Sequence, residues 1–168
     1  YLSNSLNSNM YENPDKSRSL RDAFGNFATG VTIITTTDTD GSPRGFTANS
    51  FTSVSLEPPL LLVCIAKTAH SAPIFSDAKH FAINILSELQ RELSGLFASQ
   101  EANKFAHSKW SHGLKNLPIL KDNIAHFICE NDRLVDAGDH LILIGKVLDH
   151  KVSEGTPLGY FKGNYFSV

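Results

Sequence analysis

The chain has 168 residues, a length typical of one domain that buries a substantial core. Its 15 basic and 17 acidic side chains nearly cancel, so neither nucleic acid nor an anionic membrane surface is expected as a partner. The longest apolar run, residues 60–66, is far short of the about 20 residues that cross a bilayer, and no secretory signal pattern opens the sequence. Cys64 and Cys129 lie in separate apolar segments, which predicts two buried thiols, no disulfide, no metal site and a cytoplasmic protein.

The N-terminal residues 1–16 are rich in Asn and Ser and show no periodicity. They are predicted to form a loosely ordered tail before a single domain at residues 17–168. The apolar residues that follow recur at the spacing of one helical face: Leu20, Ala23, Phe24 and Phe27. We expect a helix here that carries this apolar face and stops at Gly30.

Seven segments carry the β-branched or alternating pattern of strands: residues 31–37, 45–50, 60–66, 81–86, 123–129, 133–137 and 140–148. Residues 38–43 are typical of a hairpin turn, with Gly41 available for a positive φ. The run at 60–66 is apolar throughout, which predicts a strand buried on both faces. These strand segments, with helices between several of them, predict a mainly β fold, a small barrel with helical decoration. The glycine-rich motifs of Rossmann and P-loop nucleotide sites are both missing from the sequence.

A second helix is predicted to open at the capping box formed by Ser87 and Gln90. The side chains it is expected to bury are Leu89, Leu93, Leu96 and Phe97. Residues 99–120 are polar and irregular, which indicates a surface excursion pinned by Trp110. His107 and His112 in this segment lack acidic or cysteine partners at the spacing of a tetrahedral metal site.

The stretch from Gly45 to Leu60 combines a strand-like alternation with many small polar side chains. Those within nine residues of each other are Thr47, Asn49, Ser50, Thr52, Ser53 and Ser55. A strand that only fills a core does not need so many short donors and acceptors, and they suit a ligand rich in oxygen and ring nitrogen. The competing interpretation is a Ser- and Thr-rich connection between two strands.

The segment Gly45–Pro59, GFTANSFTSVSLEPP, closely resembles the signature of the flavin reductase-like family. Three further segments, at residues 24–33, 81–86 and 138–142, agree with the family in the same order, so the resemblance covers roughly residues 18–166. The members of this family are FMN-binding split barrels that serve as the reductase components of two-component flavin-dependent monooxygenases. The resemblance therefore implies a split β-barrel, FMN or FAD as cofactor and NADH or NADPH as co-substrate. It also implies a homodimer and a monooxygenase partner that receives reduced flavin.

The flavin-contacting residues that the resemblance implies come from several segments: Thr29, Gly30, Val31, Thr32, Thr47, Ala48, Asn49, Ser50, Phe51, Ser53, Ser55, Cys64, Ile65, Ala66, Lys67, His70, Ser71, Asn84 and Tyr165. Among them, the loop at 67–73 follows a strand and precedes a short helix, an arrangement that favours a phosphate site. The resemblance assigns the nicotinamide contact to His140, whose flat ring can stack and hydrogen-bond near neutral pH.

Each of these roles has a structural alternative. Thr29 and Thr32 would be ordinary strand residues, and Lys67 and His70 would be solvated loop residues. Asn84 would be a hydrogen-bonded core amide, and Asp139-His140 would only form a turn.

Two other functions are compatible with parts of the sequence. A flavin-storage module without turnover would use the same hydroxyl-rich stretch, but it would have no need of a nicotinamide contact at His140. A relative of pyridoxamine-phosphate oxidase would need additional basic residues for a second phosphate, and the five arginines are widely spread: Arg18, Arg21, Arg44, Arg91 and Arg133.

Overall fold

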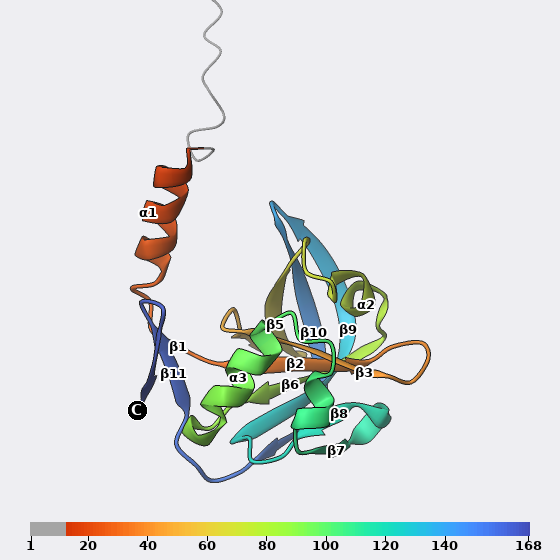
Figure 1. The fold of residues 1–168 in the computed structure, drawn as a ribbon. Coiled ribbons are helices and arrows are strands. Elements are labelled where there is room, and N and C mark those ends of the chain that lie inside the picture. The colour runs from red at the N-terminus through yellow and green to blue at the C-terminus, as the bar shows by residue number, and fades with distance from the viewer. Residues whose placement is uncertain (1–12) are drawn as a thin grey trace, which may run out of the picture.

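The computed structural model describes residues 13–168, so the tail predicted at residues 1–16 lies almost entirely outside the described residues. The first helix, α1 (Pro14–Phe24), stands away from the rest of the molecule (Figure 1). Asn13 caps it by accepting a hydrogen bond from the Asp15 amide at 2.9 Å, and Pro14 occupies the first turn, where an amide hydrogen is not needed.

The predicted apolar face of this helix is not packed on the domain. The helix ends at Phe24 with Gly25 as its cap, not at Gly30, and none of its residues is buried. Phe24 is 70% exposed, and Phe27, which lies beyond the helix, is 80% exposed. The predicted end of the helix is therefore wrong, and the two rings are exposed to another surface.

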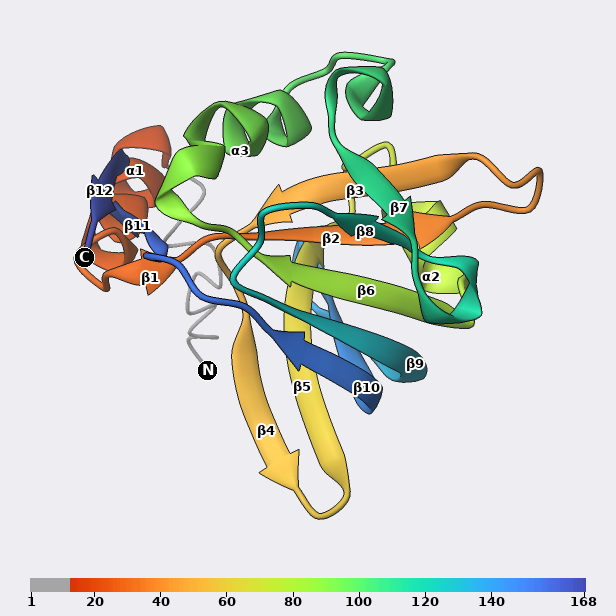
Figure 2. The same cartoon turned by 90° about the horizontal axis from the view of Figure 1, so that it is seen from below.

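The body of the molecule is an antiparallel sheet of seven strands in the order β3-β2-β6-β9-β10-β5-β4. Their bounds are β2 (Thr32–Thr37), β3 (Pro43–Ala48), β4 (Thr52–Leu56), β5 (Pro59–Ala66), β6 (His80–Ile85), β9 (Ala125–Ala137) and β10 (His140–Val152). Figure 2 shows the sheet curling so that β2 and β3 lie across from β4, β5 and β10. The predicted mainly β fold, of split-barrel type, is confirmed.

The barrel is open between its two outer strands, β3 and β4, which follow each other in the chain but do not pair. Ser50, in the link between them, lies opposite Cys64 in the register that pairs Thr52 with Leu62. Its hydroxyl accepts from the Cys64 amide at 3.0 Å and donates to the Cys64 carbonyl at 3.1 Å. A side chain thus continues the β4–β5 ladder by one more pair.

Three clusters of buried side chains form the core, and the smallest contains Ala82, Leu117, Ile119 and Ile128. The first fills the barrel and includes Ile34, Val63 and Phe81. The second lies on the other face of β2 and includes Ile33 and Phe97. Strand β2 is therefore buried on both faces, as are the middle of β6 and the short β8 (Pro118–Leu120), whereas along β5 only alternate residues are fully buried, contrary to the prediction for 60–66.

The helices cover the sheet from several sides: α2 (Ala72–Asp77), α3 (Arg91–Ala98) and the short 3-10 turns η1 (Glu88–Gln90), η2 (Lys104–His107) and η3 (Leu114–Asn116). The predicted capping box is half formed: the Gln90 side-chain oxygen accepts from the Ser87 amide at 3.0 Å, whereas the buried Ser87 hydroxyl has no hydrogen-bond partner among the described residues. Leu89 was expected in the core but is 85% exposed. None of the helices between residues 13 and 168 is long and apolar enough to cross a membrane.

Two small sheets complete the fold. One contains β1 (Thr29–Gly30), β11 (Leu158–Phe161) and β12 (Asn164–Ser167), and the other contains β7 (Trp110–His112) and β8 (Pro118–Leu120). All three residues of β8 are buried, so the segment 99–120 is more than a surface excursion, although Trp110 does pack against the second core cluster. Residues 125–137 form one bulged strand, not two.

Gly45 permits the contact between β3 and α3. A Cβ at this position would lie 2.8 Å from Cε1 of Phe97 and 3.1 Å from the carbonyl oxygen of Ile34. Phe97 is buried, so its ring cannot simply move into solvent.

We predict that Gly45→Ala lowers the free energy of unfolding by about 1–3 kcal/mol, the usual range for overpacking a core. Gly95→Ala is the matched control, because nothing lies within 4 Å of that added Cβ in helix α3, and it should raise stability by about 0.5–1 kcal/mol. Denaturant unfolding measures both. Equal effects of the two substitutions would contradict this account of Gly45.

Candidate functional site

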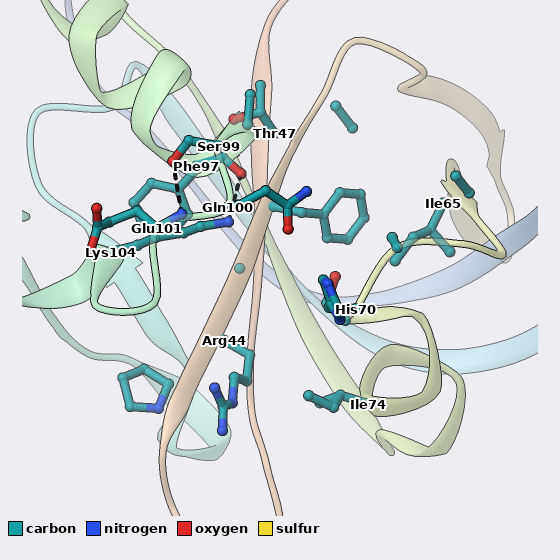
Figure 3. A pocket seen from close by; sticks show the side chains of 18 of the residues that line it. Arg44, Thr47, Ile65, His70, Ile74, Phe97, Ser99, Gln100, Glu101 and Lys104 are labelled. Atoms are coloured by element: carbon teal, nitrogen blue, oxygen red, sulfur yellow. Dashed lines mark hydrogen bonds between the residues drawn. The ribbon is translucent and has the colours of Figure 1, made fainter.

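A cleft of about 860 Å³ runs along β3. Figure 3 shows Arg44 and Thr47 on this strand, with Phe97, Ser99, Gln100 and Lys104 on one side of it and Ile65, His70 and Ile74 on the other. The first wall follows the end of α3, and the second follows the end of β5 and the start of α2. His140, on β10, also lines the cleft and is paired in register with Ala66 of β5.

The position of the cleft follows from the open barrel. β3 is hydrogen-bonded only to β2, so its outer edge carries backbone N–H and C=O groups that no strand satisfies. Beyond Leu62, the neighbouring β5 is not covered by β4 either. A planar ligand with ring nitrogens and carbonyl oxygens can hydrogen-bond such an edge, which is the chemistry that a flavin ring presents.

The structure brings together half of the residues predicted to contact flavin or nicotinamide. Those that line the cleft are Thr47, Ala48, Asn49, Ser50, Cys64, Ile65, Ala66, His70, Ser71 and His140. They come from β3, the end of β5, the β5–α2 loop and the start of β10, which are far apart in the sequence. Cys64 is only half-buried here, unlike Cys129, whose burial raises the pKa of its thiol to about 12.

The other predicted residues lie outside this cleft: Thr29, Gly30, Val31, Thr32, Phe51, Ser53, Ser55, Lys67, Asn84 and Tyr165. Several have partners elsewhere. The Thr32 hydroxyl donates to the Ala48 carbonyl at 2.6 Å, and Lys67 forms an ion pair with Asp136 at 2.9 Å. The Tyr165 hydroxyl is 2.8 Å from the hydroxyl of Ser94.

Asn84 is a core amide in this structure. It is fully buried, and its nitrogen donates to the Ile33 carbonyl at 3.0 Å while its oxygen accepts from the Leu120 amide at 3.0 Å. It also contacts the Thr35 hydroxyl and the Asn123 side chain. All of its hydrogen-bonding capacity joins β2, β6 and β8, which favours the structural alternative over a flavin contact.

Two hydroxyl groups of the Gly45–Pro59 segment also stabilise the fold by hydrogen-bonding to backbone groups. Thr47 donates to the Ser94 carbonyl of α3 at 2.7 Å, and Ser50 is bonded to Cys64. Their oxygens can still accept a hydrogen bond from a ligand, but their hydrogens are committed. Asn49 differs, because its side chain is exposed at the cleft.

The charged groups around the cleft favour an anionic ligand. Arg44 and Lys104 are the basic residues of the lining, accompanied by two histidines, and Glu101 is its one carboxylate. Partial burial lowers the pKa of Lys104, whose ammonium donates to the Phe97 carbonyl at 3.1 Å and so caps the end of α3.

Asp139 orients His140. Its carboxylate lies 2.7 Å from Nδ1 of the ring, and this hydrogen bond, together with the histidine's charge, lowers the pKa of Asp139. The Asp139 carbonyl accepts from the Lys67 amide at 2.9 Å, which ties the turn to the end of β5. A carboxylate at Nδ1 favours the hydrogen on that nitrogen and leaves Nε2 available to a ligand.

The resemblance implied that the loop at 99–120 shapes access to the flavin, but the sequence named no site residue in the wall at residues 97–105, and it missed Arg44. The wall has no periodicity or motif, so only its packing brings it to β3. Arg44 had a signal, because it precedes Gly45 of the signature and lies six residues after Asp38, across the hairpin turn.

Residues 24–168 match the family described as the flavin reductase like domain. The chain belongs to this family. A relative in Acinetobacter baylyi, the reductase component of a flavin-dependent trigonelline monooxygenase, is 51% identical over 91% of the chain and 49% of its own length. FMN reductase (NADH) SmoA of Agrobacterium fabrum is 42% identical over 90% of the chain and 86% of its own length.

Among solved structures, a complex of a Streptomyces globisporus NADH:FAD oxidoreductase with NAD and FAD fragments superposes with a TM-score of 0.86 at 34% identity. This alignment covers 91% of the chain and 93% of the other protein. The chain spans only about half the length of the first two curated relatives it matches, 49% and 48%.

We predict that Asn84→Ala lowers the free energy of unfolding by about 2–3 kcal/mol, because it leaves buried amide donors and acceptors without partners. Asn49→Ala, the same substitution at an exposed position of the cleft, should leave stability unchanged and weaken flavin binding instead. Thermal unfolding and flavin titration separate the two effects. If Asn84→Ala weakened flavin binding at unchanged stability, the core role would be wrong.

Proposed function

We propose that this protein is an NAD(P)H:flavin oxidoreductase that reduces FMN or FAD and supplies the reduced flavin to a monooxygenase. The observation that carries the proposal is the cleft on the open edge of β3, which combines backbone hydrogen-bonding groups, basic side chains and His140. The family relationship supports it, since relatives of known name include an FMN reductase (NADH) and an NADH:FAD oxidoreductase.

The residues present fit the two nucleotides. The β3 edge with Asn49 would hold the polar rim of the flavin ring, and His70 and Ser71 would meet its phosphate. When bound, the nicotinamide and flavin themselves supply the hydride transfer. The protein's part is to bring the two rings into reacting contact, and His140, oriented by Asp139, would position the nicotinamide.

No side chain is required as an acid or base in this reaction.

The storage module remains the second candidate, and the pairing of Asp139 with His140 argues against it. Storage does not need an oriented imidazole at the flavin site. A relative of pyridoxamine-phosphate oxidase is disfavoured because Arg44 is the one arginine of the cleft.

We further propose that the protein is a homodimer. Helix α1 buries none of its residues. Its last residue, Phe24, and Phe27 just after it expose most of their surface, although their spacing is that of a packed helical face. A second copy of the chain would cover these rings. A dimer would also give a role to predicted flavin-contacting residues, such as Thr29, that do not line the cleft of their own chain.

We predict that the wild-type protein oxidises NADH or NADPH only when FMN or FAD is added. His140→Ala should raise the KM for the nicotinamide nucleotide about tenfold, which corresponds to about 1.4 kcal/mol, with a smaller change in kcat. Asp139→Ala should change KM in the same direction by less, because the imidazole remains but loses its orientation.

His150→Ala is a matched control on the same strand, since His150 is absent from the lining of the cleft. Flavin binding without nucleotide oxidation by the wild type would overturn the reductase assignment and favour storage.

We predict that Phe24→Ser combined with Phe27→Ser shifts the protein from dimer to monomer in sedimentation or light-scattering measurements. Removing two exposed rings deprives the proposed interface of its largest apolar groups. Leu89→Ser, at a residue that is 85% exposed elsewhere on the chain, should leave the mass unchanged. A wild-type protein that is monomeric at micromolar concentration would contradict the proposal.

A further inference from the structure

Arg44 is the one cation of the cleft that is held by a carboxylate in a fixed turn. Its Nε donates to Asp38 Oδ2 at 2.7 Å. The other oxygen of Asp38 accepts from the amides of Asp40 and Ser42, at 3.2 and 3.0 Å. The hairpin between β2 and β3 thereby fixes the carboxylate, and the carboxylate fixes the arginine.

Asp38 remains ionised at neutral pH. Its hydrogen bond with Asp40, followed by that with Arg44, lowers the pKa of Asp38 to about 2. The ion pair with Arg44 therefore persists throughout the range in which a nucleotide-dependent enzyme would be assayed.

This pairing leaves the end of the guanidinium unused. The contact is made through Nε, while the two terminal nitrogens carry four more N–H donors in one plane. The Arg44 side chain is 44% exposed and lines the cleft. A guanidinium that is fixed through Nε and has both terminal nitrogens unpaired within the described chain is preorganised to bind phosphate oxygens.

The position of Arg44 separates it from the other polar groups of the cleft. His70 and Ser71 belong to the β5–α2 loop, whereas Arg44 lies on β3 beside the turn (Figure 3). Lys104, the other basic residue, is bonded to the Phe97 carbonyl. The cleft therefore offers an anion contact at Arg44 that is distinct from the loop expected to meet the flavin phosphate.

We propose that Arg44, positioned by Asp38, binds a phosphate group of the nucleotide in the cleft and so determines which nucleotides the protein accepts. The proposal rests on the reductase function proposed above. The phosphate has two possible sources, the diphosphate of the nicotinamide dinucleotide and the phosphate of the flavin, which have the same chemistry toward a guanidinium.

The test compares each phosphorylated ligand with its phosphate-free analogue. NADH is paired with reduced nicotinamide riboside in steady-state kinetics, and FMN is paired with riboflavin in fluorescence titration. The variants are Arg44→Gln, Arg44→Lys and Asp38→Asn. Arg133→Gln is the matched control, because Arg133 also pairs with a neighbouring aspartate, at 3.0 Å, but is absent from the lining of the cleft.

We expect Arg44→Gln to raise the KM for NADH or the Kd for FMN about tenfold or more, as for loss of a charge-assisted hydrogen bond, and to change kcat less than twofold. The constants for the analogue that lacks phosphate should not change. A penalty with NADH identifies the dinucleotide as the source, and a penalty with FMN identifies the flavin. Arg44→Lys should recover part of the loss, and Asp38→Asn should produce a smaller loss of the same kind.

Two results would overturn the proposal. One is an Arg44→Gln protein that matches Arg133→Gln with both phosphorylated ligands. The other is an equal penalty with the phosphate-free analogues, which would show that Arg44 acts through the shape of the cleft. If the wild type binds FMN but does not oxidise NADH, the reductase function fails, while the comparison of FMN with riboflavin still tests Arg44. Thermal unfolding of each variant identifies any loss that is due to misfolding.

Discussion

The candidate site depends on one pairing that the sheet does not make, that between β3 and β4. A closed barrel would satisfy every backbone group at this place, whereas the open one leaves a row of donors and acceptors along β3. The cleft lies on that row, between β3 and the part of β5 that β4 does not reach. Recognition of a polar ring can therefore use backbone groups, and the side chains around it are left to set charge, access and selectivity.

The wall opposite β5 is held largely by aromatic packing, with a hydrogen bond from Lys104 to the Phe97 carbonyl. The ring of Phe97 lies against Gly45, and it contacts Phe105 edge-on with centroids 5.0 Å apart; Phe105 in turn meets Trp110 at 5.5 Å. This aromatic series anchors an irregular segment to the second core cluster. The shape of the cleft and the stability of the fold are consequently coupled, because Phe97 both packs α3 against β3 and lines the cleft.

The sequence predicted the strands, and half of the site residues that it named line the candidate cleft, because both groups leave local signals. Alternation marks the strands, and the signature from Gly45 onward marks β3 and its link to β4. The failures have physical causes. The sequence left two roles open for Asn84, a polar residue in an apolar strand, because its hydrogen-bond partners on β2 and β8 are distant in the chain. Phe24 and Phe27 have the spacing of a buried helical face, but no other part of the described chain covers them. The 97–105 wall is formed by long-range packing and has no pattern to read.

The hydroxyl of Ser50 gives the opening between β3 and β4 a defined width. The Ser50 hydroxyl bonds to the backbone of Cys64 where a backbone pair would otherwise lie, and so fixes the start of β4 against β5. The short link at residues 49–51 is thereby fastened to β5 at one point, in register with β4. A change in its length on the Asn49 side would alter the opening of the barrel without touching the core.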